Sequence, residues 1–367
     1  MQVDVVRPQE LGIGDLARWQ GLQAGDTSLD SPFLCPEFSI AVAAVRPSAR
    51  LAVFSDGAGG TGYLPFERGR LGGGSAIGIG LSDVQGIVAP AGSDVDLNAV
   101  LRAAGIGLFH FDHWLAAQEP WLSALPSRLV GETSPALDLS HGFDQYLDER
   151  QASSKSLLQS TARKRRKLER EHGPVMLAFH EADHSLLDLV LDWKSRQYRR
   201  TGRRDRFADH GNRALVHALL DADGPSFGAT LSVLRAGDSV VAAHLGLRSR
   251  STLAWWFPVY DPRFSAYSPG LVFLLDLARA MTDRHLTLLD LGKGDEPYKE
   301  RLGNRPIQLL RGTVARYRVQ QAIHTVGRWP SERAMQAVLG SPRLRHAGRT
   351  TLGVGGALRE RLSRPRA

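Results

Sequence analysis

The sequence has 367 residues, of which 43% are hydrophobic and 23% are charged, and its formal net charge is +8. That length suggests two domains of ordinary size, and the composition is that of a globular protein. The single cysteine, Cys35, excludes an internal disulfide framework and a multi-cysteine metal site, and it suits a reducing compartment. The acid at Asp4 argues against a secretory signal, and no apolar run approaches the ~18–20 residues of a transmembrane helix, so we expect a cytoplasmic protein.

The first clear elements are two strands at residues 51–57 and 63–66. Alternating apolar residues flank a glycine-containing turn, which is typical of a β-hairpin. The glycines that follow, between residues 72 and 80, predict loops. They form no G-x-G-x-x-G fingerprint after a good strand, so we give a dinucleotide-binding fold little weight.

A basic helix is predicted at residues 153–170. Ser153 or Ser154 can cap its start, and the Gly-Pro pair at 173–174 stops it. Residues 163–167 are five consecutive bases, which form either an exposed basic face or a cationic wall for phosphates. A second basic cluster follows an amphipathic helix and comprises Lys194, Arg196, Arg199, Arg200, Arg203, Arg204 and Arg206.

The later elements predict a mixed sheet. Two helices precede three strands, and a helix and a strand follow, an order that favours a mixed sheet over a purely parallel one. Strands at 231–237 and 240–247 repeat the pattern of the first hairpin, so we predict two copies of one α/β unit, residues 1–145 and 146–320. The elements of the second copy are expected near 186–193, 212–220, 229–235, 239–248, 252–259, 270–284 and 286–291.

The most informative stretch runs from Trp255 to Gly303. The turn Ser268-Pro-Gly270 opens a helix whose free amide N–H groups can hold an anion. Residues 290–299 then place two aspartates, a glutamate, a tyrosine and two lysines in ten positions. Acyl transfer to an amine needs a base for the amine, a polarised donor carbonyl and an acid for the leaving group. We therefore expect an acyl-transfer site here.

Four residues are candidates for the chemistry. His244 lies in the middle of a strand, and its ordinary pKa suits a base near neutral pH; the alternative is a buried histidine hydrogen-bonded to a neighbour. Asp290 ends a strand and Asp295 lies in the turn after it, so either can bind the acceptor amine or take its proton. Asp290 can instead cap the Gly292 turn. Tyr298 is a candidate acid toward the leaving group, or else a packing tyrosine.

The candidates for binding the donor surround the helix start. Lys293 and Lys299 can contact phosphate. Lys299 can instead form an ion pair with Asp295 or Glu296, and Arg263, as an exposed loop arginine, can be merely solvated. Because no His, Asp and Glu cluster has the spacing of metal ligands, we predict no metal. The expected donor-binding residues are Arg263, Tyr267, Ser268, Gly270 and Lys299.

A basic tail is predicted at residues 321–367. From Arg328 to Ala367 nine arginines stand against Glu332 and Glu360, so this segment supplies nearly all of the excess positive charge. It can attract nucleic acid, anionic lipid or an acidic partner, or it can simply be solvated.

Eight short motifs recur in one known family. They are Ser31-Pro-Phe33, Leu64-Pro-Phe66, Leu81-Ser-Asp83 with Gly86, His244-Leu-Gly-Leu-Arg248, Trp255-Trp256, Tyr260-Asp-Pro262, Tyr267-Ser-Pro-Gly270 and Asp290-Leu-Gly-Lys-Gly-Asp-Glu-Pro-Tyr-Lys299. These motifs resemble the GNAT acyltransferase superfamily, and most of all the branch of cellulose or exopolysaccharide biosynthesis acetyltransferases, which is related in fold to the Fem-type aminoacyl-tRNA-dependent transferases. The resemblance covers roughly residues 30–315. It implies an α/β (α+β) protein with tandem GNAT-like domains, each a mixed, mostly antiparallel sheet flanked by helices, and acetyl-CoA or another acyl-CoA as co-substrate.

The sequence departs from this family at the donor turn. GNAT enzymes usually hold the coenzyme A pyrophosphate with Q/R-x-x-G-x-G/A, and the matching positions here are Ser265, Ser268 and Gly270. A backbone cradle can persist, because a helix start supplies N–H donors whatever its side chains are, but Pro269 removes one of them. This departure leaves room for a donor other than coenzyme A.

Three functions remain open. The first is an N-acyltransferase that moves an acyl group from acyl-CoA to an amine of a sugar, a peptide or a cell-envelope or polysaccharide precursor. The second is a Fem-like aminoacyl transferase, which the basic clusters favour because tRNA binding depends on phosphate contacts. The third is a non-catalytic GNAT scaffold that binds membrane-associated synthesis machinery.

Overall fold

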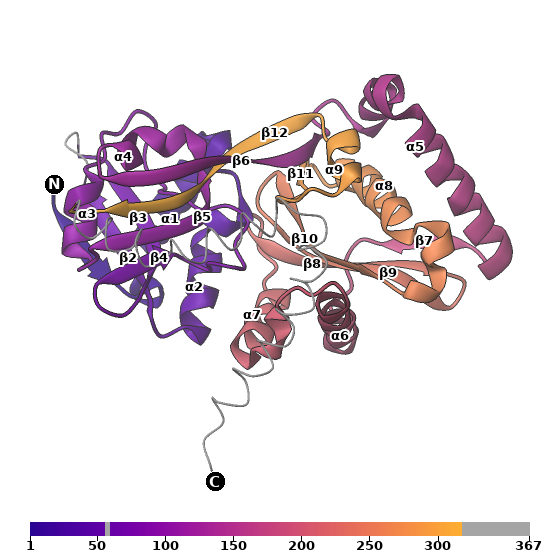
Figure 1. Ribbon diagram of the computed structural model, residues 1–367, viewed down its shortest axis with the longest axis horizontal. Helices are drawn as coiled ribbons and strands as arrows, with labels where there is room; N and C mark the ends of the chain where they lie inside the picture. The colour runs from indigo at the N-terminus through magenta and orange to yellow at the C-terminus, as the bar shows by residue number, and fades with distance from the viewer. Residues whose placement is uncertain (56–58, 318–367) are drawn as a thin grey trace, which may run out of the picture.

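The computed structural model describes residues 1–55 and 59–317. The basic tail predicted at 321–367 lies outside the described residues. Within them, strands and helices follow one order twice along the chain, once before and once after a long helix (Figure 1).

The first half contains a hairpin with two helices before it and a parallel strand pair after it. The hairpin is formed by β2 and β3, so the strands predicted at 51–57 and 63–66 are confirmed for the described residues, which do not include 56 and 57. The elements are β1 (Val3–Val6), α1 (Ile13–Gly25), α2 (Pro36–Val45), β2 (Ala49–Ser55), β3 (Thr61–Arg68), β4 (Gly73–Ala76), α3 (Leu97–Ala103), β5 (Leu108–Leu115), α4 (Glu119–Ser123) and β6 (Ser127–Asp138).

The second half repeats this order after the long helix α5 (Phe143–His172). The repetition confirms the predicted duplication and the predicted class, a mixed and mostly antiparallel sheet flanked by helices. The elements are β7 (Val175–Ala178), α6 (His184–Arg200), α7 (His210–Leu220), β8 (Gly228–Ala236), β9 (Ser239–Arg248), β10 (Thr252–Tyr260), α8 (Pro269–Thr282), β11 (Leu288–Asp290), α9 (Pro297–Leu302) and β12 (Arg305–Ala315).

The two halves exchange their last strands. Within the described residues, twelve strands form one sheet in the order β1-β2-β3-β4-β5-β12-β6-β11-β10-β9-β8-β7. Thus β6 pairs with β11 of the second half, β12 pairs with β5 of the first half, and β6 and β12 pair with each other between the halves (Figure 1). The division at residues 145 and 146 stays a prediction, and the sheet itself runs across it.

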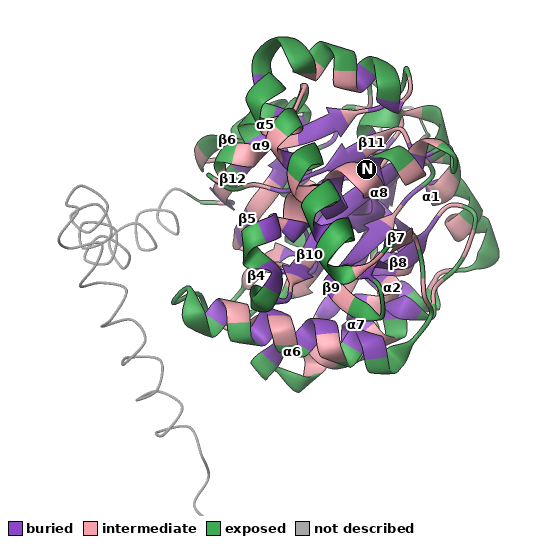
Figure 2. Cartoon of the chain, turned by 90° about the vertical axis from the view of Figure 1, so that its right-hand side faces the viewer, coloured by how far each residue is buried: buried purple, intermediate pink, exposed green. Residues whose placement is uncertain are grey.

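The helices cover both faces of this sheet. On one face α1, α2, α6 and α7 pack on a single apolar core that draws side chains from both halves. On the other face, one core lies under α3 and a separate core lies under α5 and α8. Figure 2 shows α6 and α7 with alternating buried and exposed residues, as amphipathic helices on a sheet require.

Three boundaries differ clearly from those expected. Helix α6 runs to Arg200, so four residues of the second basic cluster lie within the helix and do not follow it. Helix α5 begins ten residues before Ser153, directly after Gly142, whose φ of +90° ends the preceding turn. Ser154 therefore lies inside the helix, at a kink where its φ is −132°, and its hydroxyl donates to the Arg301 carbonyl. The predicted stop is confirmed, because Gly173 has a φ of +95° and ends α5 before Pro174. The predicted turn at 290–299 also contains the start of the short helix α9.

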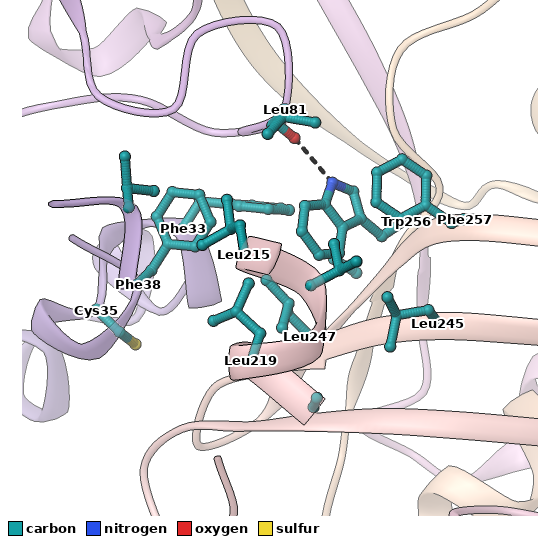
Figure 3. Packing of buried hydrophobic residues seen from close by; sticks show 14 of the residues in the cluster. Phe33, Cys35, Phe38, Leu81, Leu215, Leu219, Leu245, Leu247, Trp256 and Phe257 are labelled. Atoms are coloured by element: carbon teal, nitrogen blue, oxygen red, sulfur yellow. Dashed lines mark hydrogen bonds between the residues drawn. The ribbon is translucent and has the colours of Figure 1, made fainter. Parts of the chain in front are cut away.

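A tryptophan joins the two halves directly. The Trp256 indole N–H of β10 donates to the Leu81 carbonyl oxygen at 2.8 Å. The Phe33 ring packs edge-on against the indole, with the two ring centroids 5.6 Å apart. Figure 3 shows Phe33 of the first half facing Leu215 and Trp256 of the second. The loop that carries Leu81 is therefore fixed against the second half.

The strand exchange can be tested with two glycines. At Gly312 of β12, an added Cβ would collide with the Arg128 carbonyl oxygen of β6, whereas at Gly131 of β6 it would meet no atom within 4 Å. We expect Gly312→Ala to lower the free energy of unfolding by about 1–3 kcal/mol. Gly131→Ala should change it by less than about 1 kcal/mol. Urea denaturation measures both, and equal losses would contradict the pairing of β12 with β6.

Candidate active site

The candidate site lies where two parallel strands separate. β10 and β11 pair over three positions, from Thr252 with Leu288 to Ala254 with Asp290. β11 then ends, while β10 passes a bulge between Ala254 and Phe257 and continues to Tyr260. Beyond the last pair the strands part, and a cavity of about 750 Å³ opens there.

The cavity wall combines elements of both halves. The second half contributes the end of β10, the start of α8, the turn after β11, the last turns of α6 and the arginines that follow α6. The first half contributes Asp83. Residues more than 200 positions apart in the chain therefore meet around one space.

The corresponding gap in the first half is closed by a glutamine. β4 and β5 are also parallel and pair from Gly73 with Leu108 to Ser75 with His110. Gln85 then takes the place of a continuing strand: its backbone N–H donates to the His113 carbonyl oxygen at 2.8 Å and its carbonyl accepts from Leu115 at 2.9 Å. Its side-chain amide also donates to Asp112 at 2.8 Å. This gap is thus filled by protein.

The same loop brings Asp83 to the cavity of the second half. Asp83 lies 3.8 Å from the His113 ring, and His113 in turn lies 3.0 Å from Asp112. Burial raises the pKa of the Asp83 carboxyl, and His113, Arg206 and Lys299 oppose that rise. A carboxylate with a raised pKa is a better base near neutral pH.

Lys194 of α6 is a buried lysine of the cavity wall. Its ammonium donates to the Pro258 carbonyl oxygen at 2.9 Å, which holds the end of β10. Burial, together with Arg203 and Arg206, lowers the pKa of Lys194 to about 7. The basic cluster that contains Lys194 could be seen in the sequence, but the burial of this one lysine could not.

The start of α8 lines the cavity. Ser268 has a φ of +49° and a ψ of 54°, a left-handed conformation that favours glycine. Its hydroxyl accepts a hydrogen bond from the Lys164 ammonium of α5 at 2.7 Å. Of the five consecutive bases in α5, Lys164 thus contacts the Ser268 turn at the start of α8, while Arg165 pairs with Asp276.

The first comparison with known proteins concerns the sequence. Residues 155–300 match the model of the acetyltransferase (GNAT) domain family. The second half of this chain contains a GNAT-type acetyltransferase domain. No curated protein sequence matches the chain.

Solved structures agree with this fold. FemX has a TM-score of 0.56 at 12% identity, with 88% of this chain and 100% of that chain covered. A conserved protein of unknown function from Bacteroides thetaiotaomicron has a TM-score of 0.55 at 13% identity, covering 85% and 100%. The C-terminal domain of a protein assigned as a lysylphosphatidylglycerol synthetase from Agrobacterium fabrum has a TM-score of 0.53 at 13% identity, covering 85% and 94%. These likenesses show the fold.

The four residues expected to be catalytic lie in different places relative to the cavity. Tyr298 lines the cavity, and burial raises the pKa of its hydroxyl to about 12, although the neighbouring Trp255 indole opposes the rise. Asp295 is exposed on the turn and is not part of the cavity wall. Asp290 is buried behind the wall, where it accepts from the Gly292 N–H at 2.9 Å and from the Ser134 hydroxyl, so it caps the Gly292 turn.

His244 lies in the core of the GNAT domain. Its exposed fraction is 0%, its ring stacks on Trp255 at 4.5 Å, and its Nε2 accepts the Trp256 backbone N–H at 3.2 Å. Burial lowers the pKa of His244 to about 3. This position matches the alternative of a buried, hydrogen-bonded histidine and keeps the ring out of reach of a substrate in the cavity.

The expected donor-binding residues divide into two groups. Ser268, Gly270 and Lys299 line the cavity of the GNAT domain. Tyr267 is packed behind it, with its hydroxyl donating to Glu171 at 2.6 Å, and Arg263 lies outside it, bound to Asp261 at 2.6 Å.

Lys299 is fully engaged within the turn. Its ammonium donates to the carbonyl oxygens of Gly292 and Lys293 at 3.1 and 3.0 Å and pairs with Glu296 at 3.2 Å. This is the structural ion pair that the sequence left open, and it fixes the shape of the cavity wall.

Two negative findings concern the described residues. Their His, Cys, Asp and Glu side chains form no group of three or more that could hold a metal ion. Among the helices that the structure describes, none is long and apolar enough to span a bilayer.

The burial of Asp290 predicts a pH effect on stability. Burial raises the pKa of Asp290 from its ordinary 3.8 to about 6, so the folded protein binds this proton more tightly than the unfolded chain does. The wild type should therefore lose stability as the pH rises from about 4 to about 6. The loss at this site should be at most about 3 kcal/mol.

Asp290→Asn should remove this dependence, because the amide oxygen can still accept both hydrogen bonds but no longer titrates. The free energy of unfolding, measured in urea at several pH values, should favour the variant increasingly between pH 4 and 6. A constant difference between the two proteins over that range would contradict the assignment.

Proposed function

We propose that this protein is an N-acyltransferase that moves an acyl group from acyl-CoA, such as acetyl-CoA, to an amine. The observation that carries the proposal is the separation of β10 and β11, which opens a cavity of about 750 Å³ lined by the start of α8 and by the Asp83 carboxylate. The match of residues 155–300 to the GNAT domain family supports the same chemistry.

The donor would bind with its phosphates at the start of α8. Leu271 and Val272 direct their N–H groups to the Ser268 carbonyl, and Pro269 has none, which leaves Gly270 as the backbone donor of this turn. The Ser268 hydroxyl and the Lys164 ammonium, 2.7 Å apart, add a polar donor and a charge. A lysine therefore replaces N–H groups that the usual motif would supply.

The acceptor amine would be deprotonated by Asp83. The amine nitrogen attacks the thioester carbonyl carbon, the C–N bond forms, and the C–S bond breaks. The amine proton passes to the Asp83 carboxylate, and the Tyr298 hydroxyl is the candidate donor of a proton to the leaving thiolate. No covalent enzyme intermediate is needed, and Cys35 is buried away from the cavity wall. An amine of a sugar, a peptide or a cell-envelope or polysaccharide precursor is the proposed acceptor.

A donor carried on RNA is the second candidate. Arg203, Arg204 and Arg206 line the cavity and would contact the phosphates of an aminoacyl-tRNA. A donor that binds the folded state must raise the melting temperature, so thermal shifts with acyl-CoA esters and with aminoacyl-tRNA separate the two candidates. If neither donor binds or reacts, the non-catalytic scaffold becomes the better interpretation.

Asp83 and Asp295 form a matched pair of tests for the base. Asp83→Asn should lower kcat/KM for acyl transfer by about 10²–10⁴-fold, because the amine loses its proton acceptor. Asp295→Asn, an equally conservative change on the exposed turn, should retain nearly full activity. Steady-state rates of thiol release measure both. If Asp295→Asn abolished turnover and Asp83→Asn did not, the base would lie on the turn instead.

Lys164 and Arg163 form a matched pair of tests for the donor site. Lys164→Met should raise the KM for acyl-CoA roughly 10-fold or more, because a charged hydrogen-bond donor is lost from the cradle. Arg163→Met removes the adjacent exposed cation of α5 and should leave KM unchanged. Melting temperatures of both variants control for folding, and equal effects on KM would reduce the role of Lys164 to general surface charge.

A further inference from the structure

A histidine of the first half approaches the proposed base from outside the cavity wall. His113 belongs to β5, its side chain is 14% exposed, and its Nε2 lies 3.8 Å from the Asp83 carboxylate. Asp83 lines the cavity, whereas His113 is outside the set of described residues that do so. A group in this position acts on a substrate only through Asp83.

A bulge in β5 brings His113 and its neighbour together. Where β5 pairs with β12, residues 112 and 113 together oppose the single residue Arg311. Successive side chains of a regular strand point to opposite faces, but a bulge turns one of them out of this alternation. The Asp112 carboxylate accordingly lies 3.0 Å from His113 Nδ1, on the ring edge opposite to the one that faces Asp83.

Asp112 decides which nitrogen of the ring carries the proton. Burial raises the pKa of the Asp112 carboxyl, but hydrogen bonds from His113 and Gln85 help to bring it below its ordinary value, so the carboxylate is ionised near neutral pH. An ionised carboxylate only accepts hydrogen bonds, and His113 Nδ1–H must therefore donate to it. The Nε2 lone pair of the neutral ring is then directed toward Asp83.

Gln85 holds this arrangement in place. Its side-chain nitrogen donates to Asp112 at 2.8 Å and to the Ser82 hydroxyl at 3.0 Å. Its side-chain oxygen accepts from the backbone N–H groups of Asp112 and His113, at 3.0 and 3.1 Å. Because Ser82 directly precedes Asp83, one glutamine fixes both the loop of the base and the strand of the histidine.

We propose that His113 is a positioning residue that orients the Asp83 carboxylate and takes over the proton that Asp83 removes from the acceptor amine. Its part in a reaction rests on the proposed function. The O–H bond of protonated Asp83 breaks, an N–H bond forms at His113 Nε2, and the imidazolium lies between two carboxylates, those of Asp83 and Asp112. Asp83 thus returns to its basic form, and the partly exposed ring passes the proton to water. The 3.8 Å contact is longer than a hydrogen bond, and such contacts commonly tighten only when a substrate is bound.

The charges around Asp83 set the expected pH effect. Burial raises the pKa of Asp83, and among the groups that oppose this rise His113 acts most strongly. Loss of the histidine should therefore raise the pKa of Asp83 further, and a base with a higher pKa is lost at a higher pH. The titratable and charged groups that face Asp83 are Asp112 and His113 of β5, Tyr198 of α6, Arg206 after α6, Asp290 of β11 and Lys299 of α9.

His113→Asn and His110→Asn form a matched pair on β5. Asparagine at position 113 can still donate to Asp112 but takes up no proton, so kcat/KM for acyl transfer should fall about 10-fold or more. The acidic limb of its pH profile should also move to higher pH. His110, whose Nδ1 contacts the Gly312 carbonyl oxygen at 3.0 Å, should tolerate the same change with an unaltered rate and profile. Added imidazole should restore activity to His113→Ala and none to Asp83→Asn.

Nuclear magnetic resonance of the full chain tests the same contacts without turnover. The 13C titration of the Asp83 carboxyl should show a higher pKa in His113→Asn than in the wild type. The 15N shifts of neutral His113 should report the Nδ1–H tautomer, which Asp112→Asn should lose. An unchanged Asp83 titration, an Nε2–H tautomer, or equal pH profiles of wild type and His113→Asn would overturn the proposal even with normal acyl transfer. A wild type that transfers no acyl group but gives both resonance results would refute the proposed function and leave the pairing of His113 with Asp83 standing.

Discussion

The separation of β10 from β11 is the constraint on which the candidate site depends. Two parallel strands that share three paired positions cannot fill the space beyond them, so the bulge in β10 and the early end of β11 leave a cavity inside an otherwise continuous sheet. α8, which connects these strands, begins at the open end and directs its first turn toward the cavity. Lys299 and Asp290 then hold the turn after β11 in place, without facing the substrate as free groups.

The strand exchange explains why the site belongs to both halves. Because β6 and β12 pair across the centre of the sheet, the first half is fixed against the second, and its loop between β4 and α3 lies over the cavity. The Trp256 indole fastens that loop at Leu81, two residues before Asp83. The first half therefore supplies a carboxylate and a wall, while the second half supplies the helix start and the divided strands.

Local patterns predicted much of the fold, and long-range packing decided most of the site. The hairpins, α7, α8 and the stop at Gly173 follow from apolar spacing and glycine positions, which act over a few residues. The start of α5 was missed although the stretch after Gly142 carries helix signals, an acid at Asp144 in the first turn and the buried Phe143 and Tyr146 at helical spacing. His244 stands among small and apolar residues and lies in the core, whereas Lys194 belongs to a basic cluster and is nonetheless buried against the cavity. Asp83 could not be assigned from its neighbours, because its role depends on the other half of the chain.

The two halves differ in how the gap between their parallel strands is filled, and Gln85 fills the gap of the first half. It satisfies the backbone of β5 at Leu115 and His113 and closes the gap in the first half, where the second half keeps an opening between its strands. An opening in a sheet leaves backbone groups and apolar side chains without protein partners, which lowers stability. Two fused copies divide these demands: the first half closes its gap with protein and packs against the second half, which keeps its gap open.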